Sequence, residues 1–152
     1  MNKIFLLLFL IILSYSQNLE ITSNHFEYNQ SSNISIFSGD VNATKGSDNI
    51  LSDTITLYLT KDKKLDKLIA DGNVSFKVKD NNSTYIGKSG KLTYIAPKEL
   101  FIFEQNVHIQ KIEDKQELFG EKVIINKKDG TARVIGKKHQ PLKFIIKVNS
   151  EN

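Results

Sequence analysis

A short motif recurs along this 152-residue chain at a nearly constant interval, and the repeat limits the folds that the chain can adopt. Its copies are IFSGDVNA at 36–43, IADGNVSF at 69–76 and IFEQNVHI at 102–109. Their central residues Gly39, Gly72 and Gln105 lie 33 residues apart, and a degenerate fourth copy places Gly136 another 31 residues on. Such a period indicates a repeat architecture, in which each unit buries its apolar face against its neighbours.

A second motif runs in phase with the first, so that each unit reads as strand, turn, strand. Its copies are SNHFEY at 23–28, SDTITL at 52–57, SGKLTY at 89–94 and GEKVII at 120–125. Apolar and polar residues alternate around both motifs, as in NVSFKVK at 73–79. An alternation with period two predicts antiparallel strands with one face buried and one face in water.

The glycine of the first motif predicts how these strands are arranged. Gly inside a strand marks a bulge or a sharp bend, where the chain can cross from one sheet to the facing one. Repeated at each level, the bend predicts an all-β fold, a two-layer, open-ended antiparallel β-jellyroll of about four strand-turn-strand units. At Gln105, which replaces the glycine, we expect the bend to be more costly or absent.

Three segments carry further predictions about faces and elements. In ILSDTITLYL at 50–59, the even spacing places Leu51 on one face with Ile55, Leu57 and Leu59. LFIF at 100–103 is apolar on both faces, so that Ile102 and Phe103 compete for the interior. KKLDKLIA at 63–70 is read as part of a strand, although its leucine spacing also fits a short helix.

The two ends of such a stack leave strands without partners. The first strand is expected at 18–23 and the last at 143–148, and neither contains proline. Exposed strand edges can pair with another chain. Last-to-first pairing would be a head-to-tail contact that does not close and therefore grows a filament. The alternative is that flanking tails cover both edges.

The N-terminus has the pattern of a secretory signal peptide. Lys3 precedes ten apolar residues at 4–13, and small residues flank a cleavage position after Ser16. We therefore expect a signal peptide at 1–16 and one domain at 17–152, with an uncleaved membrane anchor as the alternative. Removing Lys3 lowers the formal net charge from +4 to +3. The chain has no cysteine, so strand pairing and packing alone must stabilise the fold.

Motifs for catalysis or cofactors are lacking. The chain has no phosphate-binding loop, nucleophile elbow or zinc motif, and His25, His108 and His139 are too far apart for paired metal ligands. We predict a non-enzymatic protein without a cofactor or metal. Three segments, around Asn42, Asn73 and Asn82, match the acidic-x-Asn-x-Ser/Thr sequon of bacterial N-glycosylation, a minor hypothesis that favours Asn82.

The paired motifs resemble those of the OstA-like family. ITSNHFEYNQSSNISIFSGDVNATKGSDNILSDTITLYL is the best match and YIGKSGKLTYIAPKELFIFEQNVHIQ the second, within a resemblance over 18–148. The resemblance implies a β-jellyroll in the Gram-negative periplasm that binds lipopolysaccharide through its lipid A portion. It also implies that the protein receives this lipid from an inner-membrane extractor with an LptC-like protein. Head-to-tail protomers would pass it to an LptD-like outer-membrane protein.

The resemblance also implies which residues line the lipid path. Such proteins hold acyl chains against an apolar interior while the sugars stay in water. The lining expected from the resemblance and from strand alternation is Leu19, Ile21, Tyr28, Phe37, Val41, Leu57, Phe76, Tyr94, Phe103, Val107 and Ile109.

Two other functions fit part of the pattern. The repeats could serve assembly alone, in a secreted β-rich structural or adhesion protein without a lipid ligand. The chain could also be an LptC-like subunit that keeps its N-terminus in the membrane. At any single position, a lining role competes with an ordinary role in the core of a β-sandwich.

Overall fold

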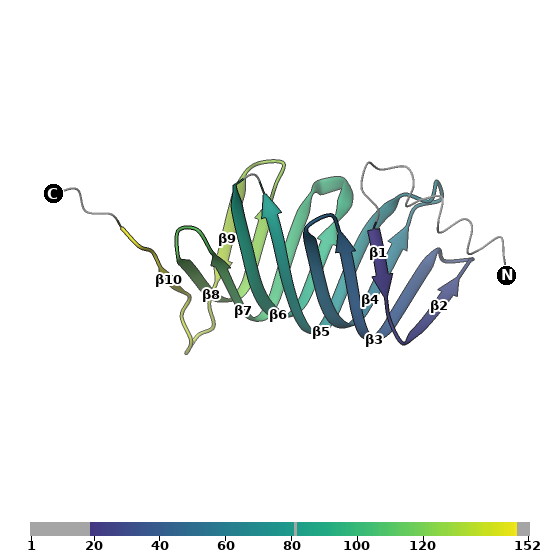
Figure 1. The fold of residues 1–152 in the computed structure, drawn as a ribbon, viewed down its shortest axis with the longest axis horizontal. Helices are drawn as coiled ribbons and strands as arrows, with labels where there is room; N and C mark the ends of the chain where they lie inside the picture. Colours follow the sequence, from purple (N-terminus) through teal and green to yellow (C-terminus); the bar gives the residue numbers. More distant parts are fainter. Residues whose placement is uncertain (1–18, 81, 149–152) are drawn as a thin grey trace.

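The computed structural model describes residues 19–80 and 82–148, which form ten strands and one turn of 3₁₀ helix (Figure 1). The expected signal peptide at 1–16 lies outside the described residues. The elements are β1 (Leu19–Thr22), β2 (His25–Asn29), β3 (Ile34–Lys45), β4 (Asp48–Leu59), β5 (Leu65–Asp80), β6 (Ser83–Ile95), η1 (Ala96–Lys98), β7 (Leu100–Lys111), β8 (Gln116–Asn126), β9 (Thr131–Ile135) and β10 (Lys143–Ile145).

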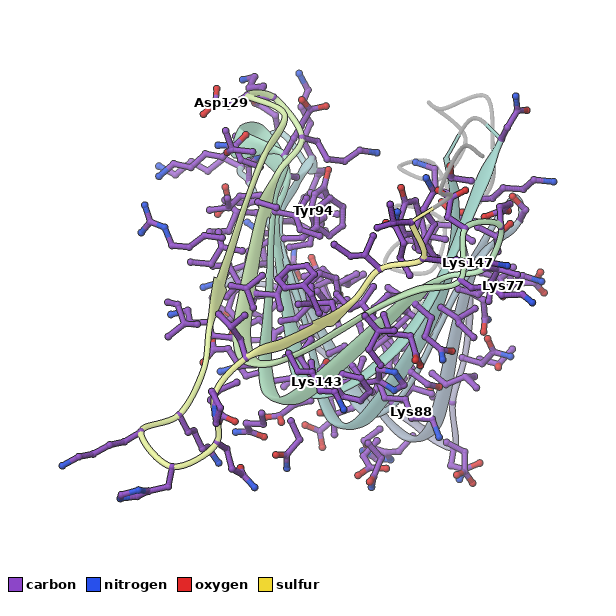
Figure 2. All side chains as sticks on the ribbon, turned by 90° about the vertical axis from the view of Figure 1, so that its left-hand side faces the viewer. Lys77, Lys88, Tyr94, Asp129, Lys143 and Lys147 are labelled. Carbon is purple, nitrogen blue, oxygen red and sulfur yellow. The ribbon has the colours of Figure 1, made fainter. Side chains whose placement is uncertain are left out.

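All ten strands belong to one antiparallel sheet in the order β1-β3-β4-β5-β6-β7-β8-β10, with β2 beside β3 and β9 beside β8. The six long strands β3 to β8 bend near their middles, and the sheet thereby folds into two facing arms that Figure 2 shows as a V. The first arm begins with β2 and ends with β9, and the second begins with β1 and ends with β10. The predicted all-β, open-ended fold is confirmed.

Each bend of a motif strand consists of two consecutive residues with left-handed backbone. The pairs are Gly39–Asp40 (φ 81° and 47°), Gly72–Asn73 (85° and 49°) and Gln105–Asn106 (72° and 51°). The register shifts with both neighbouring strands at Gly72 and Gln105, and with β4 at Gly39, where β2 and β1 pair on either side of the bend. The repeated motif therefore marks a two-residue bulge, which kinks the strand and lets it continue in the other arm.

Gln105 adopts the same bend as the glycines, so the bend is present there without glycine. At Gly72, the opposing Asp53 side chain of β4 fills the space, and an added Cβ would lie 2.9 Å from the Asp53 Cβ. At Gln105 the two strands exchange roles, because the bent strand keeps its side chain and the opposing strand carries the glycine. This glycine is Gly90 of β6, and a Cβ added there would lie 2.7 Å from the Gln105 Cβ. The missing glycine is thus compensated on the neighbouring strand.

The first serine of the second motif has a role that sequence reasoning did not identify. Ser23, Ser52 and Ser89 each donate a hydroxyl hydrogen bond to the backbone carbonyl two residues later, at 3.0, 2.9 and 3.1 Å. Ser52 and Ser89 are buried. These serines supply a polar partner at the bend, where the register shift interrupts the ladder.

The structure decides these three assignments. The prediction that Leu51 shares a face with Ile55 is wrong, because the register shift at the bend reverses the alternation. Leu51 is exposed (42%), and Ser52 takes the buried position. Phe103 points inward (5% exposed) and Ile102 outward. The segment 65–70 is strand and not helix.

Among the described residues, no helix has the length and apolar character needed to cross a membrane.

We predict that Gly72→Ala destabilises the fold more than Gly130→Ala. Both glycines have positive φ, which costs an L-residue about 1–2 kcal/mol. Only at Gly72 does the added Cβ also crowd Asp53, since nothing lies within 4 Å at Gly130. Urea unfolding of the two variants measures the difference, and equal losses would show that the close approach at the bend is unimportant.

Gly90→Ala should likewise destabilise the protein, because the three atoms nearest to the added Cβ all belong to the Gln105 side chain. Because the Gln105 side chain causes this contact, adding Gln105→Gly should recover stability. The double variant should lose less free energy of unfolding than the two single variants lose together. A double-mutant cycle in urea measures this coupling. Additive losses would contradict the idea that Gly90 provides the space for the Gln105 side chain.

Ser89→Ala should lower the free energy of unfolding by about 1–3 kcal/mol, since it leaves the Lys91 carbonyl without its partner at a buried bend. Ser75→Ala, on the outer face, is the matched control, and its effect should stay within about 0.5 kcal/mol. Similar losses for both variants would argue against a specific role for the hydrogen bond.

Candidate functional site

The facing surfaces of the two arms are apolar along the whole stack. Buried residues from both arms form one cluster, with half-buried apolar residues packed against it. Of the predicted lining residues, seven are in the cluster and three lie against it. The seven are Phe37, Val41, Leu57, Phe76, Phe103, Val107 and Ile109, and the three are Leu19, Ile21 and Tyr94. Tyr28 has the inward register, opposite the buried Ser35, but is outside the cluster.

Burial decreases from the bend toward the open rim of the V. Next to the bend, Val41, Val74 and Val107 are 1–2% exposed, so the two arms pack directly on each other there. Further out, Tyr94 and Tyr85 are only half-buried. The part next to the bend therefore serves as core, and the rim part offers accessible apolar surface.

Aromatic side chains mark the boundary between these two parts. Phe76 of the second arm meets Phe103 of the first, with ring centroids 4.8 Å apart. The Phe76 ring has room because it lies over Gly87. Closer to the rim, Tyr94 stacks on Phe101 at 4.5 Å, and Figure 2 shows Tyr94 on the inner side of its arm.

Sequence reasoning missed several rim residues, namely Ile50, Leu65, Val78, Tyr85, Phe101, Leu118 and Ile125. All of them except Leu65 follow the alternation within their strands, and Leu65 reaches the inner face through a second register shift, between Tyr58 and Leu59. The signal was therefore present, but the reversal at each bend has to be known before the alternation can be assigned to a face.

The apolar face continues to both ends of the stack, where it is exposed. Phe26 of β2 lies beside Phe37 at one end and is 41% exposed. At the other end, Phe144 is 52% exposed, Ile146 58% and Val148 81%. Exposed apolar groups of this size are typical of surfaces that meet another molecule.

The rim of the first arm is basic. The turns at 60–64, 96–99 and 127–130 carry six lysines against three acidic residues, which gives a formal charge of +3. The lysines are Lys61, Lys63, Lys64, Lys98, Lys127 and Lys128, and the acids are Asp62, Glu99 and Asp129. An apolar face is thus bordered by positive charge, which suits an amphipathic anion.

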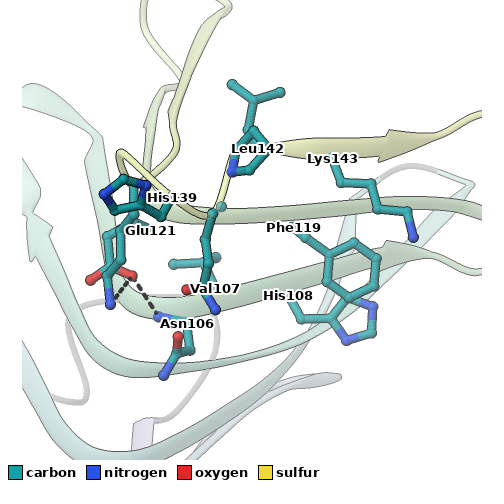
Figure 3. Close-up of a pocket in the computed structure, with 12 residues that line it drawn as sticks. Asn106, Val107, His108, Phe119, Glu121, His139, Leu142 and Lys143 are labelled. Carbon is teal, nitrogen blue, oxygen red and sulfur yellow. Dashed lines mark hydrogen bonds and ion pairs between the residues drawn. The ribbon is translucent and has the colours of Figure 1, made fainter.

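A polar cluster and a cavity lie outside this face, near the C-terminal end (Figure 3). The cavity, of about 620 Å³, separates β7 and β8 from the loop that leads to β10. Glu121 accepts a hydrogen bond from the backbone N–H of Asn106 and forms an ion pair with Lys137, both at 3.3 Å. This arrangement ties the loop to the bend.

Glu117 is the centre of the polar cluster. Hydrogen bonds from Gln110 and His108 lower the pKa of Glu117 below its usual value. The His108 ring also stacks on Phe119 at 4.1 Å. Within the described residues, no three acidic or histidine side chains are grouped as metal ligands would be.

The comparisons with known proteins agree with this geometry. A family model described as LptA/(LptD N-terminal domain) LPS transport protein matches residues 20–131. Similar solved structures include LptH, the LptA-homologous periplasmic component of the conserved lipopolysaccharide transport device of Pseudomonas aeruginosa. It has a TM-score of 0.74 and 13% identity, over 87% of this chain and 96% of that chain. No curated protein sequence matches the chain.

The similarity to LptH shows the fold, and the family match shows the family. The family match confirms the resemblance to the OstA-like family, and membership in a transport family agrees with the prediction of a non-enzymatic protein. The chain belongs to the family of LptA and the LptD N-terminal domain, and it is a lipopolysaccharide transport protein.

Proposed function

We propose that this protein is a periplasmic bridge that carries lipopolysaccharide from the inner-membrane extractor to the outer-membrane assembly complex. The observation that supports the proposal best is the inner apolar face, which runs through every level of the stack and is exposed at both ends. A face of this kind can hold a lipid at any level and release it at either end.

The acyl chains would lie along the rim part of the inner face, against residues such as Tyr94 and Phe101. Burial of acyl chains is worth about 0.8 kcal/mol per methylene and needs no specific direction. Such contacts bind several chains yet let them slide from one level to the next. The buried residues next to the bend, including Val41 and Val107, would keep the two arms together.

The phosphorylated head group of lipid A would meet the basic rim of the first arm. The turns that carry its lysines connect the strands at the open side of the V, where Figure 2 labels Asp129. There the head group of a lipid with buried acyl chains would remain in water. Attraction between these charges would orient the lipid and would weaken with added salt.

The two ends of the stack would contact the partners. An LptC-like protein would deliver lipid at one end and an LptD-like protein would receive it at the other, with further copies joined head to tail between them. Each arm holds eight antiparallel segments, so its two edge strands run in opposite directions. A second copy in the same orientation can therefore continue both arms with antiparallel pairing.

The proposed bridge function requires export of the protein to the periplasm. The N-terminal pattern at 1–16 supports cleavage after Ser16 and release of one domain at 17–152. N-terminal sequencing of the exported protein tests this directly. A retained apolar segment would instead favour the LptC-like alternative.

A photoreactive residue in place of Tyr94 should crosslink to lipopolysaccharide, because this position is inside the V and half-buried. Thr93, the preceding residue on the outer face, is the matched control and should give at least about tenfold less product at equal protein concentration, since alternate residues face opposite sides. Mass spectrometry or immunoblotting of the adduct measures both yields. Equal crosslinking at both positions, or none at Tyr94, would reject the inner face as the lipid path.

A further inference from the structure

A continuous row of outward side chains crosses the first arm from one edge to the other. Successive cross-strand partners pair Ile36 with Thr56, Thr56 with Ile69, Ile69 with Thr93, Thr93 with Ile102 and Ile102 with Ile124. All six members of this row are β-branched and uncharged. Side chains directly opposite one another on a sheet interact, and such rows help to set the register of the strands.

The row ends in a charge of opposite sign at each edge. Glu27 of β2 is the partner of Ile36, and Arg133 of β9 is the partner of Ile124. Both side chains are exposed. Arg133 is the single arginine of the chain. No ion pair or hydrogen bond of Arg133 occurs within the described residues, and Glu27 contacts only the neighbouring His25 there, at 3.1 Å.

We propose that Arg133 of one copy pairs with Glu27 of the next copy and thereby sets the register of the head-to-tail joint, an inference that rests on the bridge function proposed above. In this register β9 and β2 overlap over their full five residues. The row then continues without interruption from one copy into the next. Arginine suits such a contact, because its planar guanidinium can bind a carboxylate with two hydrogen bonds.

Other registers lose this ion pair. A slip of one residue would turn the inner face of one copy outward. A slip of two residues would place Arg133 opposite either His25 or Asn29, and neither carries a negative charge. Among registers that keep the inner faces aligned, only one therefore brings the opposite charges together.

The same register matches the inner face. It places Val134 opposite Phe26 of the next copy and Ala132 opposite Tyr28, so that apolar side chains meet inside the joint. On the second arm, continuing the rows places Phe144 of β10 opposite Ile21 of the next copy. The exposed apolar groups at the two ends of the stack thus cover each other.

Engineered cysteine pairs test the register, since the chain has no cysteine of its own. Thr131→Cys with Asn29→Cys, and Ile135→Cys with His25→Cys, are directly opposite in the proposed joint and should form intermolecular disulfides. The matched controls exchange the partners, Thr131→Cys with His25→Cys and Ile135→Cys with Asn29→Cys, and should form at least about tenfold less, since disulfides require Cα atoms within about 7 Å.

Charge reversal tests the ion pair. Glu27→Arg and Arg133→Glu should each weaken self-association by about threefold to tenfold, which is the range for turning a cross-strand attraction into repulsion. The double variant should recover wild-type association. Lys88→Glu changes the net charge as Arg133→Glu does, but lies in the middle of the sheet on β6, and should have no such effect. Analytical ultracentrifugation measures association, and thermal unfolding verifies that each variant is folded.

The outcomes separate this inference from the proposed function. If copies associate and crosslink to lipopolysaccharide, but the exchanged cysteine pairs react or charge reversal has no effect, the register inference is wrong and the bridge proposal stands. If the wild-type protein stays monomeric at high concentration, head-to-tail bridging fails and the inference fails with it. Disulfides at both proposed pairs, with recovery in the double charge variant, would establish the register.

Discussion

The whole structure depends on one backbone event, a bend that every long strand makes at the same level. A flat antiparallel sheet of this length would have one apolar face open to water. Because the bends are aligned across β3 to β8, the sheet folds along one line and its apolar face closes on itself. The left-handed pairs that begin at Gly39, Gly72 and Gln105 are therefore the origin of both the core and the candidate lipid path.

The line of bends tolerates sequence change because its requirements are shared between neighbouring strands. A bend needs two left-handed residues on one strand and space on the other. Gly72 meets both needs itself, whereas Gln105 keeps its side chain and Gly90 supplies the space. The buried serines Ser52 and Ser89 provide a hydrogen bond at the same line. A family can therefore keep this architecture while its individual motifs degenerate.

The V also explains how one face can serve both stability and binding. Residues next to the bend are enclosed and hold the arms together, whereas residues near the rim keep part of their surface exposed. A lipid that binds at the rim does not have to displace the core. The open ends follow from the same plan, since no element among the described residues closes the first or the last level of the stack.

Much of this architecture could be predicted from the sequence. The 33-residue period, the alternation within strands and the glycine positions indicate bent antiparallel strands, and ten of the eleven predicted lining residues lie in or against the apolar cluster. The sequence also indicated which strands lie at the edges of the stack, because the repeat begins after the first of them and ends before the last.

Three features were decided only by the tertiary structure. Which face Leu51 or Ile102 occupies depends on the register shift at the bend, and register results from pairing between strands that are distant in sequence. The compensation of Gln105 by Gly90 involves two strands that meet only in the folded sheet. The row that ends at Glu27 and Arg133 likewise joins residues about a hundred positions apart, which alternation within one strand cannot relate. The sequence by itself determined the repeating unit, and the pairing between units decided which side chains meet.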